Sequence, residues 1–265
     1  MTWPIVISIE GNIGSGKSTI IQQLSPLFDD LCTDVIIVDE PVDEWKTITD
    51  VNGKTMIELF YSNPSKYSFV FQMMAYISRL VILKKAIRNH PNSIIITERC
   101  LDTDYNIFAT MLYEQGQLLK EEFDVYKKWF DYFAEDIHIS GYIYIRCNPE
   151  VSHERCMKRA RLGEDTITLD YLTTCHLKHE KWMSEVEIPY ITIDNDETDI
   201  DPVLEMVYDF IMECNYTIHP SLNTIKLYLL NLILFPFVVL PMFNIVRIVF
   251  YRFSSWIIYA PTAIV

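Results

Sequence analysis

The sequence Gly11-Asn12-Ile13-Gly14-Ser15-Gly16-Lys17-Ser18-Thr19 satisfies the pattern G-x-x-x-x-G-K-[ST]. An apolar run predicts a strand over residues 5–10, directly before the loop, and residues 17–27 have a helical pattern. Between a strand and a helix, such glycines let backbone N–H groups surround an anion, and Lys17 adds a full charge beside the helix N-terminus. We therefore expect a nucleoside triphosphate to bind along residues 11–19, with the Ser18 hydroxyl as a ligand of Mg²⁺.

Beyond this loop, short β-branched runs alternate with longer helical patterns as far as residue 215. The predicted strands cover residues 5–10, 35–38, 94–97, 142–146 and 190–193, and the predicted helices cover residues 17–27, 65–89, 121–134, 151–160, 169–183 and 202–212. Apolar strands separated by helices indicate an α/β domain in which a five-stranded parallel sheet has helices on both faces. Such sheets bind ligands at the carboxyl ends of their strands.

Composition restricts the class of protein. The formal net charge of −14 over 265 residues argues against binding nucleic acid through its phosphates, which requires clustered Lys and Arg. The six cysteines form no C-x-x-C pair and show no metal-ligand spacing, so we expect them to be reduced and mostly buried. The N-terminus has neither the basic start of a signal peptide nor the pattern of a transit peptide, which favours a cytoplasmic setting.

Four further motifs follow the loop in order. They are Glu40-Pro41-Val42-x-x-Trp45, Phe71-Gln72, Glu98-Arg99 and Arg159-Ala160-Arg161-x-x-Glu164. A carboxylate after a strand, such as Glu40, is placed to accept the proton of an attacking hydroxyl. Two arginines at a helix end beside a glycine suit a mobile lid, which brings positive charge to a transferring phosphoryl group.

With these motifs the chain resembles the deoxynucleoside kinases over about residues 3–212. The resemblance implies a P-loop kinase fold, ATP as phosphoryl donor and a homodimer built on long helices. It implies that Glu40 is the catalytic base, that Arg99 contacts the 5′-oxygen, and that Glu98 binds Mg²⁺ together with Ser18. Arg155, Arg159 and Arg161 match the arginines of the family's lid region. Cys100 departs from the family's Glu-Arg-Ser motif, which puts local hydrogen bonding in doubt.

The resemblance also implies a deoxynucleoside pocket. In it, Gln72 pairs with the base edge and Phe108 stacks on the ring, while Tyr61 and Glu164 hold the 3′-hydroxyl and Trp45 and Phe71 line the walls. Arg79 lies two helical turns after Gln72 on the same face. Arg79 and Asp104 match the pair by which deoxycytidine and deoxyguanosine kinases differ from thymidine-preferring relatives. We therefore expect a preference for deoxycytidine and deoxypurines, with thymidine-accepting broad specificity as the alternative.

Residues 216–265 differ from the kinase-like region 1–215. They contain no Asp or Glu, and residues 227–246 are 20 residues without a charge, which is long enough to span a bilayer. Three interpretations remain open for this tail. It is a membrane anchor that tethers a cytoplasmic kinase, a segment that packs on an apolar patch of the kinase or its partner, or a segment without function.

Two rival functions also stay open at this point. A nucleoside monophosphate kinase has a similar phosphate loop and lid, but normally shows Asp-Arg where this chain has Glu98-Arg99. A non-catalytic nucleotide-binding scaffold could inherit the same fold. It would have no physical need for Lys17, Glu40, Glu98, Arg99 and the lid arginines together.

Overall fold

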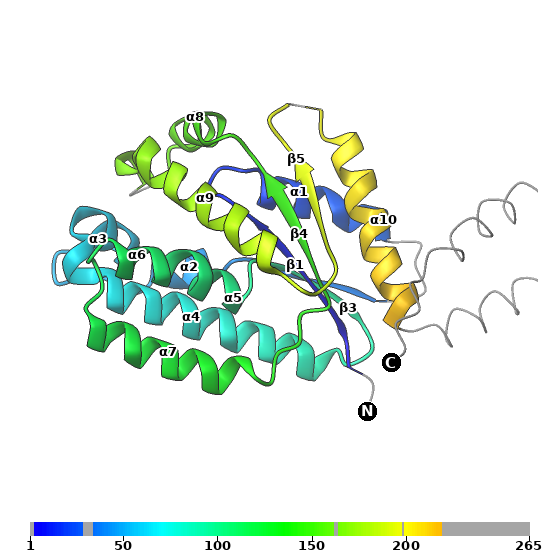
Figure 1. Ribbon diagram of the computed structural model, residues 1–265, viewed down its shortest axis with the longest axis horizontal. Coiled ribbons are helices and arrows are strands. Elements are labelled where there is room, and N and C mark those ends of the chain that lie inside the picture. The colour runs from blue at the N-terminus through cyan, green and yellow to red at the C-terminus, as the bar shows by residue number, and fades with distance from the viewer. Residues whose placement is uncertain (1–2, 29–33, 162–163, 198, 219–265) are drawn as a thin grey trace, which may run out of the picture. The chain divides into compact units, whose positions relative to one another are not determined.

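The computed structural model describes residues 3–28, 34–161, 164–197 and 199–218. In this part of the chain, five parallel strands form one sheet in the order β2-β3-β1-β4-β5 (Figure 1). The strands are β1 (Ile5–Gly11), β2 (Val35–Val38), β3 (Ile94–Glu98), β4 (Gly141–Arg146) and β5 (Tyr190–Asp194). The predicted α/β fold class and parallel sheet are confirmed, and the predicted strand ends differ by one residue at most.

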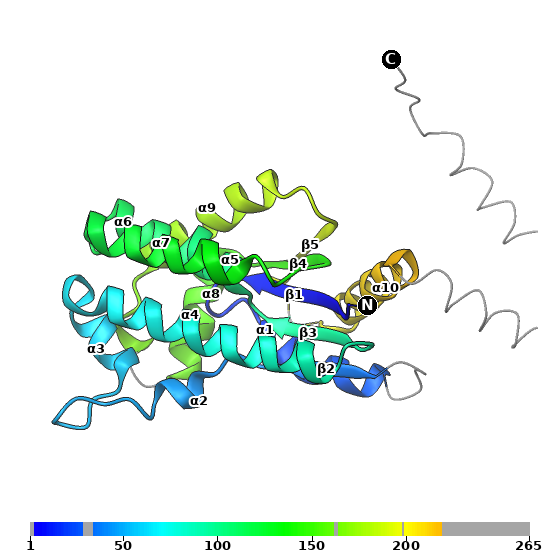
Figure 2. The ribbon, with the colours of Figure 1, turned by 90° about the horizontal axis from the view of Figure 1, so that it is seen from below.

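Helices cover both faces of the sheet (Figure 1, and from below in Figure 2). On one face, α1 (Lys17–Leu24) and α10 (Asp201–Ile218) pack on the odd-numbered isoleucines of β1. On the other face, α4 (Pro64–Asn89) packs on Val6 and Ile95, and α9 (Leu169–Glu185) packs on Tyr142 and Tyr144. Of the other long helices, α7 (Lys120–Ala134) lies beside α4, and α8 (Pro149–Arg159) follows β4.

The observed helices differ from the predicted ones in instructive places. Helix α1 ends at Leu24 and continues as a 3₁₀ turn, because Pro26 has no N–H to donate to the helix. Five short helices lie in segments for which no helix was predicted. They are α2 (Val42–Trp45), α3 (Met56–Ser62), α5 (Leu101–Thr103), a π-helix (Asp104–Ala109) and α6 (Thr110–Glu114). The start of α3 carries a readable signal, since Thr55 and Glu58 form a capping box.

The tail falls almost entirely outside the described residues. In the part of the chain that the structure covers, no helix is long and apolar enough to cross a membrane. The uncharged run 227–246 lies beyond that part, so the division of the chain near residue 215 and the three interpretations of the tail stay predictions. The five described cysteines are free and buried, as expected for them.

Candidate active site

The phosphate-binding loop lies between the end of β1 and the start of α1. Gly14 and Gly16 have φ angles of 80° and 97°, in the left-handed region that favours glycine. A Cβ on Gly14 would meet the carbonyl oxygen of Ser152, and one on Gly16 would lie 2.5 Å from the side-chain nitrogen of Asn195. Both backbone conformation and crowding therefore require glycine, which keeps backbone N–H groups free to face an anion.

Lys17 is buried at the first position of α1. Its Nζ donates to the carbonyl oxygens of Asn12, at 2.7 Å, and Gly11, at 3.2 Å. Burial lowers the pKa of Lys17 to about 8, and Arg99 adds to this effect, while the nearby carboxylates oppose it. The ammonium group is thus held inside the loop at neutral pH with its charge only partly compensated, which suits it to a phosphate ligand.

Most predicted site residues line one cavity of about 580 Å³. Those that do are Ile13, Gly14, Gly16, Lys17, Ser18, Thr19, Glu40, Trp45, Tyr61, Phe71, Gln72, Arg79, Glu98, Arg99, Asp104, Phe108, Arg155, Arg159, Arg161 and Glu164. Three predicted residues of the loop, Gly11, Asn12 and Ser15, do not line it. The Asn12 amide is turned away, where it donates to the carbonyl oxygen of Leu172 on α9 at 2.8 Å.

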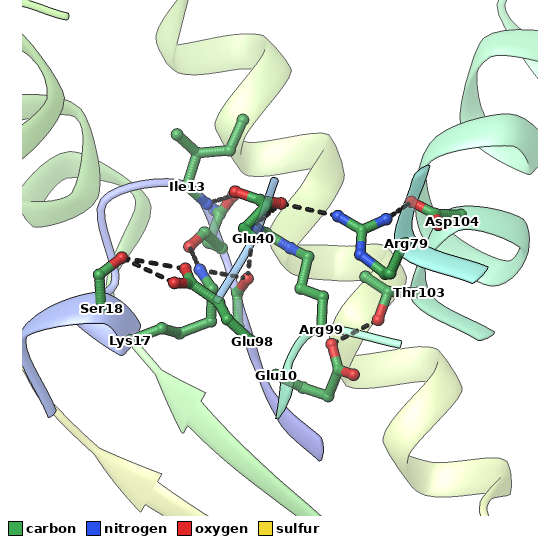
Figure 3. Close-up of polar contacts among 12 residues, drawn as sticks. Glu10, Ile13, Lys17, Ser18, Glu40, Arg79, Glu98, Arg99, Thr103 and Asp104 are labelled. Carbon is green, nitrogen blue, oxygen red and sulfur yellow. Dashed lines mark hydrogen bonds and ion pairs between the residues drawn. The ribbon is translucent and has the colours of Figure 1, made fainter. Parts of the chain in front are cut away.

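Glu40 lies at the centre of the cavity, two residues after β2. One of its carboxylate oxygens accepts from Arg79 at 2.8 Å and from Arg99 at 3.0 Å, so it sits between the two guanidinium groups (Figure 3). Burial alone would raise the pKa of Glu40, but Arg99 and Arg79 outweigh it and lower that pKa to about 2. Glu40 is therefore ionised, and able to accept a proton, at any physiological pH.

Arg79 connects Glu40 to the second carboxylate of the predicted pair. Its other terminal nitrogen donates to Asp104, and both side chains are 2% exposed. Burial raises the pKa of Asp104 to about 6, although Arg79 opposes that shift. Of the two carboxylates that share Arg79, Glu40 holds its charge more firmly because it also contacts Arg99. The structure thus brings together Glu40 from the segment after β2, Arg79 from α4 and Asp104 from the start of the π-helix.

Arg99 adopts a conformation that costs energy. Its φ of 61° is in the left-handed region, which for a residue other than glycine costs about 1–3 kcal/mol. The Arg99 carbonyl accepts from the Thr97 hydroxyl at 2.8 Å, which holds this turn at the end of β3. The guanidinium group donates to the Gly11 carbonyl at 3.0 Å and lies over the Phe108 ring. The strained turn therefore aims Arg99 at the junction of the phosphate loop and the inner cavity.

The predicted metal ligands lie side by side. The Ser18 hydroxyl is 2.9 and 3.0 Å from the two carboxylate oxygens of Glu98, which is itself 7% exposed (Figure 3). A hydroxyl and a carboxylate beside a phosphate loop are the oxygen donors that Mg²⁺ takes, with its other positions left to phosphate and water. The residues present therefore fit a magnesium ion.

The arginines of the predicted lid lie on and just after α8. Arg159 forms a 2.5 Å ion pair with Glu164, and Arg161 lies 3.5 Å from the same carboxylate. Arg155 donates to the backbone carbonyl of Asn195 at 2.7 Å, which is the residue after β5. Gly163, the glycine that follows these arginines in the sequence, lies outside the described residues, so the closing of a lid stays a prediction.

Aromatic side chains form the inner wall. Trp45 and Phe71 meet edge to face with centroids 5.8 Å apart, and the Trp45 indole donates to the Ser78 hydroxyl at 2.8 Å. Tyr61 meets Tyr171 of α9 in the same manner. These rings pack on one another and also face the cavity, so they serve the hydrophobic core and the site together.

Sequence reasoning missed several cavity residues. Asn195 follows β5 directly, and its amide donates to the Ser15 carbonyl at 2.8 Å, which supports the phosphate loop from behind. Its place after a strand could have identified it. Tyr171 has no such signal, because a tyrosine on an amphipathic helix is usually a packing residue. The other cavity residues for which no role was predicted are Gln22, Ile57, Phe60, Glu197 and Ile200, whereas Val42 belongs to the predicted Glu40 motif and Ala75 was expected beside Gln72 from the resemblance.

Comparison with known proteins decides between the remaining families. The sequence profile described as "Deoxynucleoside kinase" matches residues 7–219. The chain belongs to the deoxynucleoside kinase family. Because its members transfer a phosphoryl group from ATP, this protein is an ATP-dependent phosphotransferase acting on a deoxynucleoside. This excludes the non-catalytic scaffold and the nucleoside monophosphate kinase as its principal function.

Individual members of the deoxynucleoside kinase family are similar over most of their length. The "Probable deoxycytidine kinase" of Fowlpox virus is 34% identical over an aligned length of 220 residues, and the alignment covers 78% of this chain and 88% of the relative. Human deoxycytidine kinase is 32% identical over 72% of this chain and 84% of its own length. The mitochondrial deoxyguanosine kinase of Xenopus laevis is 31% identical over 68% of this chain and 73% of its own length.

Proposed function

We propose that this deoxynucleoside kinase prefers deoxycytidine and the deoxypurines to thymidine. The observation that carries the proposal is a pair of acceptor atoms in the inner cavity. Gln72 Oε1 and Asp104 Oδ2 are buried, and neither has a hydrogen-bond partner among the described residues. A buried acceptor without a donor is costly, so a ligand that supplies donors is favoured at this position.

The exocyclic amino group of cytosine or adenine supplies two such N–H donors. Thymine instead presents a carbonyl oxygen and a methyl group, so its N3–H pairs at most one of the two acceptors, and its methyl lies against the Arg79–Asp104 pair. The names of the similar deoxycytidine and deoxyguanosine kinases agree with this preference. The alternative, broad specificity that includes thymidine, requires Arg79 and Asp104 to move apart.

The reacting groups follow from the same geometry. With the base at Gln72 and Asp104 and the triphosphate on the loop, the 5′-hydroxyl lies near Glu40, which accepts its proton as the oxygen attacks the γ-phosphorus. Arg99 and the lid arginines stabilise the charge on the transferring group, and Tyr61 with Glu164 holds the sugar. Ser18 and Glu98 would hold Mg²⁺, which when bound reduces the charge of the phosphate oxygens.

The double substitution Arg79→Met with Asp104→Ala tests the base preference. Replacing both members removes the buried ion pair without leaving one charge alone, and opens space for the thymine methyl group. The ratio of kcat/KM for deoxycytidine to kcat/KM for thymidine is expected to fall by about 100-fold or more, from two lost contacts. An unchanged ratio in a folded double variant would show that the pair does not select the base.

The lowered pKa of Lys17 gives a pH dependence. ATP binding uses the protonated amine, so kcat/KM for ATP is expected to fall about tenfold per pH unit above about pH 8. The pKa of Lys17 is lower in the folded chain than in the unfolded chain, so the free energy of unfolding rises with pH between these two pKa values. The titration of Lys17 therefore does not unfold the protein above pH 8, and the expected loss of kcat/KM has another cause, the missing charge. The check is a pH profile of kcat/KM for ATP, with stability followed in parallel; a flat profile to pH 9.5 contradicts it.

We further propose a homodimer formed through α4 and α7, which lie side by side (Figure 1). Each helix exposes an apolar stripe. On α4 the stripe is Val70, Ile77 and Val81, and on α7 it is Val125, Trp129 and Tyr132, all between 43% and 73% exposed. Neighbouring exposed apolar stripes favour association with an identical surface about a two-fold axis.

A charge placed in this apolar face is expected to separate the subunits. In Val81→Glu, the dimer would bury an unpaired carboxylate, so sedimentation is expected to show a species near 31.2 kDa instead of one twice as heavy. Val51→Glu is the matched control, since Val51 is fully exposed on the loop after α2. A monomeric wild-type protein, or a Val81→Glu variant that remains a dimer, contradicts this interface.

The cytoplasmic setting and a membrane tether through residues 227–246 also remain proposals. Five buried, free cysteines support a reducing compartment. The uncharged length of the run supports the tether.

A further inference from the structure

A second buried carboxylate lies behind the site and takes no part in the chemistry described above. Glu10 is on β1 and is 0% exposed, yet it does not line the cavity. Ser8 and Glu10 are two polar residues on the face of β1 that packs against α4. Burying a carboxylate is costly unless hydrogen bonds compensate, so a fully buried Glu10 calls for an explanation.

Both oxygens of Glu10 accept hydrogen bonds from buried hydroxyl groups. Ser8 Oγ donates to one oxygen at 2.6 Å. Thr103 Oγ1 donates to the other at 2.5 Å (Figure 3). Hydrogen bonds to a charged acceptor are about twice as strong as neutral ones. The contact between Glu10 and Thr103 therefore ties the central strand firmly to a residue that lies 93 positions later in the sequence.

Thr103 occupies a decisive place in the chain. It is the last residue of α5 and directly precedes the π-helix, whose first residue is Asp104 and whose fifth is Phe108. A π-helix is rare and usually marks a functional site, because its geometry is less favourable than that of an α-helix and must be held by its surroundings. Thr103 is thus the attachment point of the element that carries two proposed base-recognition residues.

The middle residue of α5 is held as well. Asp102 accepts from the Tyr142 hydroxyl on β4 at 2.7 Å. Glu10 on β1 and Tyr142 on β4 therefore hold α5 from two neighbouring strands. Because Asp104 follows this fixed segment directly, its carboxylate is placed against Arg79 without any contact between Glu10 and the ligand.

We propose that Glu10 and Thr103 are positioning residues that set the acceptor affinity and base selectivity of the enzyme. They act by fixing the start of the π-helix and so the positions of Asp104 and Phe108. The selectivity part rests on the proposed base preference, whereas the affinity part does not. Within the described residues Thr103 forms no hydrogen bond with the phosphate loop, although Glu10 directly precedes that loop, so we expect the anchor to affect the acceptor side of the site more than the donor side.

Thr103→Val removes the hydroxyl group while keeping the size and shape of the side chain. In the full-length protein the KM for deoxycytidine is expected to rise about tenfold, because the charge-assisted hydrogen bond to Glu10 is lost together with the longer one, at 3.5 Å, from the Cys100 backbone N–H. The KM for ATP is expected to change less than about twofold, and Thr103→Ser is expected to restore the acceptor KM. Thr173→Val is the matched control, because the Thr173 hydroxyl bonds only its own helix α9. Glu10→Gln, which removes the charge but keeps an acceptor oxygen, is expected to have a smaller effect of the same kind.

A double-mutant cycle separates positioning from general loosening. In the wild-type background, Thr103→Val is expected to lower the ratio of kcat/KM for deoxycytidine to kcat/KM for thymidine. If Thr103 acts through Asp104, the same substitution leaves this ratio unchanged in an Asp104→Ala background. Equal rises in the KM for ATP and for deoxycytidine, or no change in either variant, would overturn the proposal. A wild-type enzyme that does not discriminate against thymidine would defeat the base preference, and the split between acceptor and donor KM would still test the anchor.

Discussion

Glu40→Gln is expected to lower kcat by about 10²–10⁴-fold, the usual contribution of a positioned general base. Glutamine has nearly the same shape and can still accept from Arg79 and Arg99, but it cannot take the proton of the 5′-hydroxyl. The measurement is single-turnover transfer of phosphate from ATP to deoxycytidine, where product release does not mask the chemical step.

Two comparisons make the Glu40→Gln result specific. Glu44→Gln makes the same change at an exposed position of α2, four residues away, and is expected to retain the wild-type rate. Thermal unfolding of Glu40→Gln shows whether the protein remains folded, since Arg79 and Arg99 lose a counter-charge. A folded Glu40→Gln variant with the wild-type kcat would remove Glu40 from the chemistry.

Lys17→Met is expected to lower kcat/KM for ATP by at least about 10²–10³-fold, because the loop loses its only full positive charge at the phosphates. The effect on stability is expected to be small. Two hydrogen bonds to Asn12 and Gly11 disappear, but so does a buried charge whose pKa is already lowered by burial. These effects oppose each other, so the free energy of unfolding is expected to change by no more than about 2 kcal/mol.

Lys17→Met is expected to lose ATP binding while its free energy of unfolding stays nearly unchanged. Lys181→Met, on the exposed side of α9, is the control and is expected to change neither quantity. Titration calorimetry with ATP measures the binding loss directly. If Lys17→Met binds ATP as tightly as the wild type, the loop does not hold the triphosphate in the way proposed.

Much of the fold could be predicted because its signals are local. Apolar runs of four to six residues predicted the strands to within one residue, and the pattern around Lys17 identified the loop between β1 and α1. The spacing of seven residues from Gln72 to Arg79 predicted one helical face, and the structure places both in the same cavity. Pro26, which ends α1, and the capping box at Thr55 are local signals of the same kind.

Contacts between distant segments could not be predicted in this way. The meeting of Glu40 with two arginines depends on the ends of β2 and β3 lying beside the interior of α4, which no local pattern encodes. The sequence around Glu10 does not indicate that this residue is buried, because its partner Thr103 lies 93 residues later on a segment with no periodicity. The strained φ of Arg99 is likewise a consequence of packing and not of local sequence.

The most direct test of the central claim is a competition in which the full-length chain phosphorylates an equal mixture of the four deoxynucleosides with Mg²⁺ and ATP. The structure predicts 5′-monophosphates of deoxycytidine and the deoxypurines, with thymidine monophosphate formed far more slowly. Thymidine phosphorylated as fast as deoxycytidine would contradict the role given to Gln72, Arg79 and Asp104. No monophosphate from any of the four would contradict the whole assignment of the site.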